Sequence, residues 1–448
     1  MANVFARLID ALDARGDATA LVIHDESISC REVVAAARAK QVALEPVIPA
    51  GSVVVVVDEF SLDSIALLLA LAAHRCIAIP VSTLGEAQAD QIIETSQASF
   101  VINRGQDVLA TEHEGDAPLY STLRERQAAG LVLFSSGSTG VPKGAVHDFD
   151  RLLENMPSKP LTGVLLAFLL FDHIGGINTL LRSLRGGAVL VMPTERSPDA
   201  VAAAIAAHAV TILPTSPSFL AMMLASGAMT RYDLSSLKVI TYGTEVMPAA
   251  LLTRVAAALP LVALKQTYGL SEVGILSSQS EANDSTWLRL GGDGFRVRVV
   301  EGMLEVKSDS GMLGYLNAPS PYTEDGWFRT FDRVEVRGDL FRILGRQSEM
   351  INVGGLKVFP QEVESALLAL SLVRDCVVFG REHPLTGQCV AAEIVIADDA
   401  DMDDATARSH IRRNLRASLD PYKVPVYITI VEAGALVSAR FKKTRTAR

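Results

Sequence analysis

The chain has 448 residues, enough for about three average domains or for one large and one small domain. Hydrophobic residues make up 49% and charged residues 21%, which excludes a disordered chain and predicts a globular protein with a sizeable core. The formal net charge of −10 argues against a general nucleic-acid-binding protein, because the surface of such a protein would be basic.

The cysteines and the apolar stretches bear on the compartment of the protein. Four widely spaced cysteines show no metal-binding spacing, and we expect buried thiols in a reducing, cytoplasmic setting. The first residues lack the layout of a signal peptide. The most apolar stretch, 65–81, is interrupted by His74 and Arg75, which favours a buried helix followed by a strand over a membrane span. The cysteines are Cys30, Cys76, Cys376 and Cys389.

Helices and strands alternate in the first quarter of the chain. Apolar spacing predicts helices at 5–12, 31–42, 64–73 and 87–96. Strands are predicted at 20–24, 27–29, 52–57, 76–80 and 100–102. The run of valines in 52–57 is typical of a parallel strand buried on both faces. This alternation predicts a doubly wound α/β layer.

The stretch 131–144 combines a short apolar strand with a loop of small hydroxyl residues, glycines and one lysine. Glycines let backbone N–H groups approach a ligand, so the loop suits a polyphosphate. It is not a Walker P-loop, because Pro142 precedes Lys143 and Gly144 follows it. A flexible Ser/Gly hairpin is the alternative interpretation.

The α/β alternation continues to residue 266. Helices are predicted at 149–155, 178–185, 198–208, 219–225 and 247–259. Strands are predicted at 163–171, 188–192, 212–213, 238–241 and 263–266. Several strands end in glycine-rich or polar turns, and in open α/β sheets ligands bind at those carboxyl ends.

Beyond residue 295 the pattern changes to short strands, predicted at 296–300, 303–307, 333–337 and 340–344, which favour an antiparallel subdomain. We predict a large domain over 1–346 and a small α+β domain over 347–448. The small domain would hold a hairpin through Gly354 and Gly355, and two helices and three strands. These are helices 360–370 and 403–419 and strands 376–380, 390–396 and 427–431, before a basic tail.

Five stretches, in this order and spacing, resemble those of the adenylate-forming superfamily. This superfamily contains acyl- and aryl-CoA synthetases, adenylation domains of nonribosomal peptide synthesis and firefly-type luciferases. The stretches are 135–144, 171–176, 266–272, 326–332 and 345–364. The resemblance implies a mobile C-terminal domain and two half-reactions. ATP and a carboxylate first form an acyl-adenylate and pyrophosphate, and a thiol then takes the acyl group.

The resemblance also implies a nucleotide site. Ser135, Ser138, Thr139 and Lys143 would belong to the phosphate loop, although Lys143 could be a plain surface lysine. Ser271 would contact the α-phosphate, and Glu272 would help to hold Mg²⁺, which prefers oxygen ligands. The remaining residues would bind the nucleoside: Gly243, Thr244 and Glu245 would wall adenine, Tyr268 would lie against it, and Asp332 and Arg346 would bind ribose.

Two stretches depart from the family pattern. Phe331 stands where the family usually has glycine, so the turn that places Asp332 could differ. Ser348 stands at the hinge position, where the family commonly has Asp or Lys, and a small serine can absorb a backbone rotation. Gly354 and Gly355 match the hairpin that lines the pantetheine tunnel, with a plain tight turn as the alternative.

The resemblance implies two further catalytic residues. Lys443 falls where the catalytic tail lysine belongs, with adjacent Lys442 as the alternative and a frayed basic tail as the other interpretation. His173 resembles the aromatic gate between the acid and ATP, or is simply a packed histidine.

The substrate expected from the resemblance is an apolar fatty or aryl acid without an α-amine. Ile174 stands where amino-acid activators have an aspartate, and Phe219, Met222 and Met223 suggest an apolar pocket. ATP, Mg²⁺ and coenzyme A are the expected cofactors and cosubstrates. Three alternatives stay open: an enzyme that loads a carrier protein or an amine, a non-catalytic nucleotide-binding regulator, and, less favoured without a Walker motif, a phosphotransferase.

Overall fold

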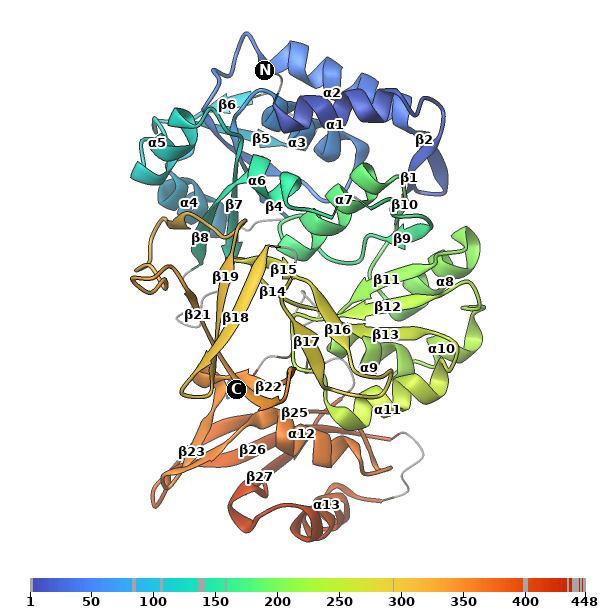
Figure 1. Ribbon diagram of the computed structural model, residues 1–448. Coiled ribbons are helices and arrows are strands. Elements are labelled where there is room, and N and C mark those ends of the chain that lie inside the picture. The colour runs from blue at the N-terminus through green and yellow to red at the C-terminus, as the bar shows by residue number, and fades with distance from the viewer. Residues whose placement is uncertain are drawn as a thin grey trace.

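A computed structural model gives the fold of the chain (Figure 1). It describes residues 3–82, 86–104, 108–135, 142–157, 159–292, 294–397, 402–432, 435–436, 443 and 445. Ser138, Thr139 and Lys442 therefore lie outside the described residues.

Two seven-stranded sheets form the framework of the N-terminal part. The first has the order β20-β8-β7-β4-β3-β5-β6, and the second has the order β13-β12-β11-β9-β10-β1-β2. The first sheet contains β3 (Val53–Val57), β4 (Ile77–Val81), β5 (Phe100–Asn103), β6 (Val108–Ala110), β7 (Gly130–Ser135), β8 (Lys143–Asp148) and β20 (Gly314–Tyr315). The second contains β1 (Thr19–Ile23), β2 (Glu26–Ser29), β9 (Val164–Leu166), β10 (Val189–Met192), β11 (Ile212–Thr215), β12 (Val239–Tyr242) and β13 (Ala263–Gln266).

Helices lie between the two sheets and on their outer faces, as Figure 1 shows. The valines of β3 alternate between these two layers. Val54 and Val56 pack into the core between the sheets, and Val53 and Val55 pack into the core on the outer face of the first sheet. The inner layer contains α1 (Val4–Asp13), α2 (Cys30–Leu44), α3 (Leu62–Ala73), α6 (Phe149–Glu154) and α7 (Ile174–Gly186). The outer helices are α4 (Glu86–Ser96), α5 (Pro118–Glu125), α8 (Pro198–His208), α9 (Pro217–Ala225), α10 (Ala228–Arg231) and α11 (Ala249–Ala258).

This arrangement confirms the predicted doubly wound fold, and local capping explains many helix boundaries. Ser29 and Glu32 form a capping box at the start of α2. Ser197 caps α8 with Pro198 at its first position, so this helix begins and ends where the sequence predicts. The short elements β6 and α5 between residues 103 and 130 were not predicted.

The stretch after β9 differs from the prediction. A strand was predicted over 163–171, but β9 ends at Leu166, and α7 begins at Ile174 instead of residue 178. The His173 side chain caps this helix by accepting a hydrogen bond from the Gly175 N–H at 3.0 Å. The sequence did not predict this start because the first turn contains two glycines, which have a low helix propensity. Close packing requires glycine at position 176, because a Cβ there would lie 1.9 Å from the Leu170 carbonyl oxygen.

A third, antiparallel sheet follows, as predicted, in the order β16-β17-β22-β21-β19-β18. A two-stranded hairpin, β14 (Tyr268–Leu270) with β15 (Gly274–Leu276), leads into it. The sheet contains β16 (Ser278–Ser280), β17 (Leu288–Leu290), β18 (Phe295–Val300), β19 (Met303–Ser308), β21 (Phe328–Arg337) and β22 (Leu340–Arg346). The predicted hinge residue Ser348 lies in a 3₁₀ turn, Gln347–Glu349, directly after β22.

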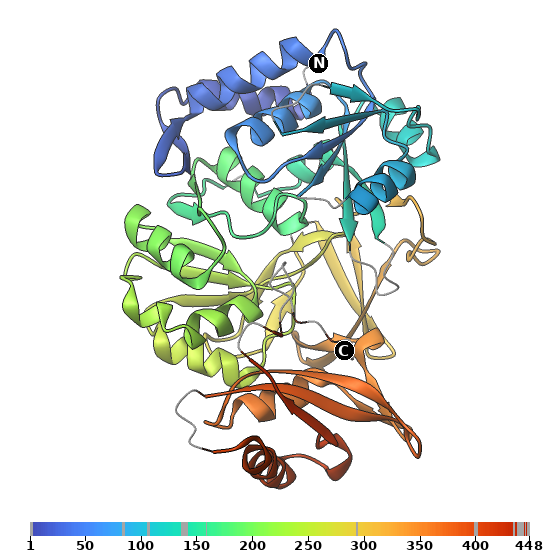
Figure 2. The same cartoon turned by 180° about the vertical axis from the view of Figure 1, so that it is seen from behind.

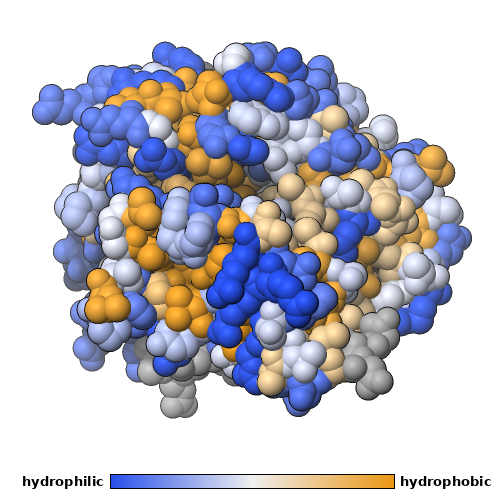
Figure 3. Space-filling view, turned by 90° about the horizontal axis from the view of Figure 1, so that it is seen from below, coloured by the Kyte–Doolittle hydropathy of each residue, from blue (hydrophilic) through white to orange (hydrophobic). Residues whose placement is uncertain are grey.

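The C-terminal domain is a five-stranded sheet with two helices, in orange to red in Figures 1 and 2. It contains β23 (Ile351–Val353), β24 (Leu356–Val358), α12 (Pro360–Leu368), β25 (Val373–His383), β26 (Gly387–Ile396), α13 (Asp404–Ser418), the 3₁₀ turn Pro421–Lys423 and β27 (Tyr427–Ile430). Its core is continuous with the apolar residues of α9 and α11. At the exposed end of this domain, Figure 3 shows hydrophilic residues interspersed with small hydrophobic groups.

Two further expectations concern membrane-spanning helices and the state of the cysteines. No helix in the described part of the chain is both long and apolar enough to cross a bilayer. The four cysteines are free and buried.

Candidate active site

The predicted phosphate loop joins two antiparallel strands, so its hairpin and phosphate-binding interpretations are compatible. Ser135 at the end of β7 pairs with Lys143 at the start of β8. The side chain of Asn317 pins the base of the loop: it accepts from the Gly144 N–H at 3.2 Å and donates to the Pro142 carbonyl at 2.8 Å.

Asp332 lies between a tyrosine and an arginine. The Tyr268 hydroxyl donates to Asp332 Oδ2 at 2.6 Å, and Arg346 Nε lies 3.4 Å from Asp332 Oδ1. Burial raises the pKa of Asp332, although Arg346 and the Tyr268 hydrogen bond oppose this. Burial and the Asp332 charge raise the pKa of Tyr268, so its hydroxyl stays protonated and donates.

Glu272 makes a similar contact with a second tyrosine. The Tyr315 hydroxyl donates to Glu272 Oε1 at 2.6 Å, and Lys143 Nζ lies 5.7 Å from the centroid of the Tyr315 ring. The other carboxylate oxygen of Glu272 has no hydrogen-bond partner within the described part of the chain. Arg346 interacts electrostatically with both Asp332 and Glu272, so it links the Tyr268–Asp332 contact to the Tyr315–Glu272 contact.

We call these six residues the central polar group: Lys143, Tyr268, Glu272, Tyr315, Asp332 and Arg346. They come from the first sheet, the β14–β15 hairpin and the third sheet, up to 203 positions apart in the sequence. The structure thus brings Lys143, Tyr268, Glu272 and Asp332 together. Tyr315 and Asn317 were missed by the sequence analysis, and no local pattern marks them.

Two residues beside this group adopt backbone conformations that their side chains disfavour. Phe331 has φ +59° and Thr244 has φ +70°, in the left-handed region that favours glycine. Phe331 thus takes a backbone conformation that favours glycine, the residue type expected there from the resemblance, and Asp332 contacts Tyr268. Such strain persists where the surrounding structure imposes it, often at functional sites.

The adjacent turns are tightly packed. A Cβ at Gly243 would lie 2.6 Å from the Thr267 hydroxyl oxygen, so only glycine fits where β12 and β13 end. Ser271 lies in the turn between β14 and β15, directly before Glu272. His147 on β8 is fully buried, and desolvation lowers its pKa to about 4, with the Ser271 backbone offsetting only part of this.

The turn that carries His173 is tied to the first sheet. The Ser82 hydroxyl, just after β4, donates to Asp172 Oδ2 at 2.6 Å. Because His173 Nδ1 accepts from the Gly175 N–H, a neutral ring carries its proton on Nε2. His173 is therefore a helix cap whose ring proton is carried on Nε2.

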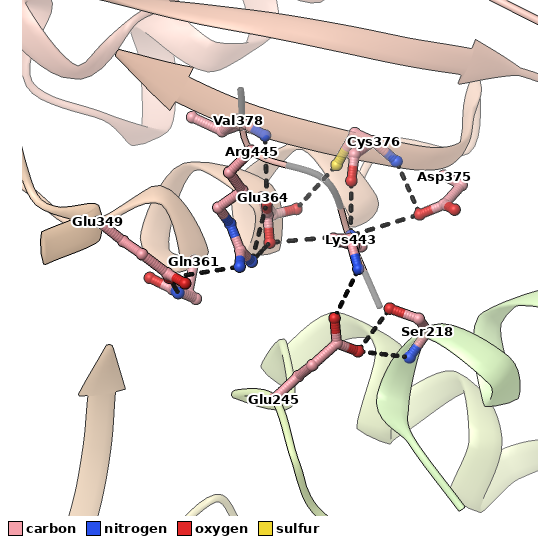
Figure 4. A network of polar contacts seen from close by, with 10 residues as sticks. All are labelled: Ser218, Glu245, Glu349, Gln361, Glu364, Asp375, Cys376, Val378, Lys443 and Arg445. Carbon is pink, nitrogen blue, oxygen red and sulfur yellow. Dashed lines mark hydrogen bonds and ion pairs between the residues drawn. The ribbon is translucent and has the colours of Figure 1, made fainter. Parts of the chain in front are cut away.

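Lys443 lies in a different polar network, and the residues that it contacts in Figure 4 do not belong to the central polar group. Its ammonium donates to the Cys376 carbonyl at 2.5 Å and lies 3.4 Å from Asp375 Oδ1 and 3.7 Å from Glu364 Oε2. Its backbone N–H donates to Glu245 Oε1 at 2.7 Å, while the Ser218 hydroxyl donates to Glu245 Oε2 at 2.5 Å. Glu245 therefore joins the tail to α9.

Arg445 completes a buried cluster around Glu364. Its guanidinium lies 3.1 Å from Glu364 Oε2 and 3.3 Å from Glu349 Oε2. Although burial opposes it, the charges of Arg445 and Lys443 hold the pKa of Glu364 below its usual range. We call Glu364, Asp375, Lys443 and Arg445 the tail cluster.

Gly354 and Gly355 lie in the β23–β24 hairpin, away from the central polar group. Gly354 donates to the Thr386 carbonyl at 2.9 Å, and the Gly355 N–H donates to Asn352 Oδ1 at 2.9 Å. Both have positive φ, and no described atom comes within 4 Å of a Cβ built at Gly355. In this arrangement the hairpin is a tight turn.

A cavity of about 210 Å³ lies beside α7. Ile174 lines it, as does β15, which begins two residues after Glu272. Phe219 and Met223 instead belong to the hydrophobic core, where Phe219 stacks on Phe168 with ring centroids 4.2 Å apart. Met222 packs against the same core.

Comparison with known proteins places the chain in a family. The family model for AMP-binding enzymes matches residues 9–304, and that for the AMP-binding enzyme C-terminal domain matches residues 362–447. The chain is 32% identical to a probable 2-succinylbenzoate–CoA ligase of Mycobacterium tuberculosis, over 68% of this chain and 81% of the relative. It is 28% identical to the indoleacetate–CoA ligase of Aromatoleum aromaticum, over 72% and 67%.

The fold agrees with solved structures. An anthranilate CoA ligase in complex with anthranoyl-AMP superposes with a TM-score of 0.83 at 22% identity, over 98% of this chain and 95% of that chain. An ATP-bound structure from Rhodopseudomonas palustris gives a TM-score of 0.78 at 22% identity, over 96% and 95%. The chain belongs to the AMP-binding enzyme family, within the adenylate-forming superfamily that its sequence resembles.

Proposed function

We propose that this protein is an AMP-forming acid–CoA ligase for an organic acid without an α-amine. In the first half-reaction, a carboxylate oxygen would bond to the α-phosphorus of ATP and pyrophosphate would leave. In the second, the thiol sulfur of coenzyme A would bond to the acyl carbon, and AMP would leave as the thiol proton is lost. Family membership and the CoA ligase activities in the names of its relatives support this proposal.

The central polar group is the observation on which the assignment of the nucleotide site rests. Asp332 and Arg346 would bind the ribose hydroxyls, with Tyr268 against the base and Gly243 to Glu245 beside it. Lys143 and the loop of Ser135, Ser138 and Thr139 would bind phosphates, and Ser271 would contact the α-phosphate. These contacts would position two anions that otherwise repel each other.

Glu272 fits the requirements of Mg²⁺. Its Oε2 has no partner in the described ranges, and Mg²⁺ binds through one or two carboxylates together with substrate phosphates. The ion would neutralise phosphate charge as it develops. Tyr315 would orient the Glu272 carboxylate through its hydrogen bond to Oε1.

The roles of the C-terminal residues require a different domain arrangement. Lys443 would have to leave Glu364 and Asp375 before its ammonium could reach the reacting carboxylate. Gly354 and Gly355 would have to approach the cleft to admit a pantetheine arm. His173 would gate the acid site through Nε2. We also propose a cytoplasmic location, because four free buried thiols suit a reducing compartment.

Carboxylate-dependent ATP–pyrophosphate exchange tests the proposal across fatty, aryl and amino acids. Wild type should exchange with an acid lacking an α-amine, and added CoA should yield the thioester. Exchange without thioester would favour transfer to a carrier protein or an amine. ATP binding without exchange by any acid would favour a non-catalytic regulator. Lys443→Ala and Lys442→Ala would show which tail lysine the exchange needs.

A further inference from the structure

One face of α7 lines the cavity beside the central polar group. Ile174, Asn178 and Arg182 follow one another at intervals of four residues, so they lie along one side of the helix. The end at Ile174 adjoins the turn of His173, and Gly274, the first residue of β15 and two positions after Glu272, also lines the cavity. Arg182 lies about 12 Å further along the helix axis, at about 1.5 Å per residue.

Most of the cavity lining is apolar, with uncharged polar side chains distributed along it. The apolar residues besides Ile174 are Leu152, Met156, Pro157, Ile177, Ile275, Leu276 and Phe295, and the uncharged polar residues are Asn155, Asn178, Ser277 and Ser310. Arg182 is the single charged side chain among the described residues that line it, and no carboxylate is among them. A ligand that fills the cavity would therefore meet a mostly apolar wall and the single guanidinium of Arg182.

Arg182 has no counter-ion among the described residues. Its Nη1 donates to the Pro157 carbonyl at 2.8 Å, and no carboxylate in the described ranges lies within ion-pair distance. Burial and the neighbouring charge of Arg185 both lower the pKa of Arg182. A guanidinium has five N–H donors, so most of its donors remain available to a planar anion such as a carboxylate. The Asn178 amide lies one turn away and makes no side-chain hydrogen bond to the described residues.

The volume of the cavity limits the size of its occupant. A protein cavity of about 150 Å³ can hold benzene. The 210 Å³ beside α7 therefore suits one aromatic ring, or a short chain with one substituent.

We propose that this cavity takes the body of the acid and that Arg182 selects an acid with a second anionic group at the end away from the reacting carboxylate. This inference rests on the proposed acid-activating function and narrows its substrate to a compact dianionic acid. The competing interpretation is structural: Arg182 merely ties α7 to Pro157.

The test compares acids that differ only in the second charge. The probes are 3-phenylpropanoate and its ortho-, meta- and para-carboxylated forms, and the assay is ATP–pyrophosphate exchange. In wild type, at least one dianionic form should exceed 3-phenylpropanoate in kcat/KM by about 10-fold or more. Hydrogen bonds to charged groups contribute about 1.5–3 kcal/mol, so Arg182→Gln should lower kcat/KM for that form about 10- to 100-fold. The same variant should change kcat/KM for 3-phenylpropanoate by less than about 3-fold.

Two further variants separate recognition from structure and from general charge. Arg182→Lys keeps the charge but not the planar fork, so it should retain part of the preference for the dianion. Arg185→Gln removes the same charge from the same helix outside the cavity, and it should affect both acids equally. An equal loss for both acids in Arg182→Gln, or no preferred dianionic form in wild type, would overturn the inference.

Calorimetric binding of the same acids distinguishes this inference from the proposed function. If no acid supports exchange but wild type binds a dianionic form that Arg182→Gln does not bind, the proposed function fails and the role of Arg182 stands. If 3-phenylpropanoate supports exchange and no dianionic form is preferred in exchange or binding, the ligase function stands and the role of Arg182 fails.

Discussion

The central polar group and the tail cluster contain the same kinds of charged side chains, but they differ in how completely those side chains are paired with one another. In the tail cluster, Glu364 is 1% exposed and Lys443 is 7% exposed, and both lie in a closed set of ion pairs. In the central polar group, Glu272 keeps one carboxylate oxygen without a partner in the described structure. The Lys143 ammonium there has no ion-pair partner among the described residues and lies 5.7 Å from the centroid of the Tyr315 ring.

In this arrangement the difference suits a structural role for the tail cluster and the ligand-binding role that we propose for the central polar group. Buried polar groups normally satisfy one another, and each member of the tail cluster has at least one ion-pair partner, although Arg445 Nε makes no hydrogen bond to the described residues. Spare donors and acceptors beside a strained turn remain available to a ligand, as in the central polar group. Changes in the tail cluster should therefore affect stability most, and changes in the central polar group should affect activity most.

The largest effect is expected from Glu364→Gln. Removing one partner from a buried ion pair costs about 3–5 kcal/mol, because Lys443 and Arg445 would keep their charges without their shared counter-ion. Urea unfolding measures the change in the free energy of unfolding. The control is Glu362→Gln on the same helix, whose exposed carboxylate pairs with Lys423 at 2.6 Å and should contribute about 0–1 kcal/mol. Equal losses in the two variants would contradict the distinction.

The next effect is a pH dependence of the free energy of unfolding that originates from the buried His147 on β8. The pKa of His147 is about 4 in the folded protein, below the ordinary value of 6.5, so folding favours the neutral ring. Its contribution is complete above pH 6.5 and is lost as pH falls towards 4, by about 3 kcal/mol in total.

Urea unfolding of wild type and His147→Leu from pH 7 to pH 4 checks this pH dependence. The stability difference between the two proteins should shift in favour of the variant by about that 3 kcal/mol as the pH falls. Carboxylates that titrate in the same range are common to both proteins and cancel. Parallel pH profiles for the two proteins would rule out a buried neutral His147.

Asp332→Asn should reduce activity more than stability. The asparagine can still accept from the Tyr268 hydroxyl, but it loses the charge that would strengthen hydrogen bonds from ribose and Arg346. We expect kcat/KM for ATP in the exchange assay to fall about 10- to 100-fold, as for hydrogen bonds to a charged group. Asp339→Asn is the matched control in the turn between β21 and β22, since its exposed carboxylate pairs with Arg289 at 2.5 Å. A similar fall in the control would remove the special role of Asp332.

The smallest effect concerns the strained turn before Asp332. Phe331 is 50% exposed, so its replacement loses little packing. Phe331→Gly should raise the free energy of unfolding by about 0.5–1 kcal/mol, because relief of the left-handed conformation exceeds the entropy cost of glycine. Phe331→Ala keeps the Cβ and the strain, so it should bring no such gain. If alanine and glycine give the same stability, the turn is not strained.

Whether a residue of the central polar group could be predicted from the sequence depended on whether it belongs to a short local motif. The pattern of Lys143, Tyr268, Glu272 and Asp332 was recognisable because each belongs to a short local motif. Tyr315 lies 43 positions from Glu272 and belongs to no such motif, so only the packing of β20 against β8 brings it there.

The sequence by itself determined the alternation of helices and strands, the parallel strands such as β3, and helix ends such as Ser197 and Pro198. These features depend on neighbours within a few residues, whose periodicity and capping are visible in the chain. The tertiary structure alone decided that α7 begins at Ile174, that Lys443 lies with Glu364, and that Arg182 faces a cavity. These outcomes depend on which distant surfaces pack together, and a local pattern carries no information about that.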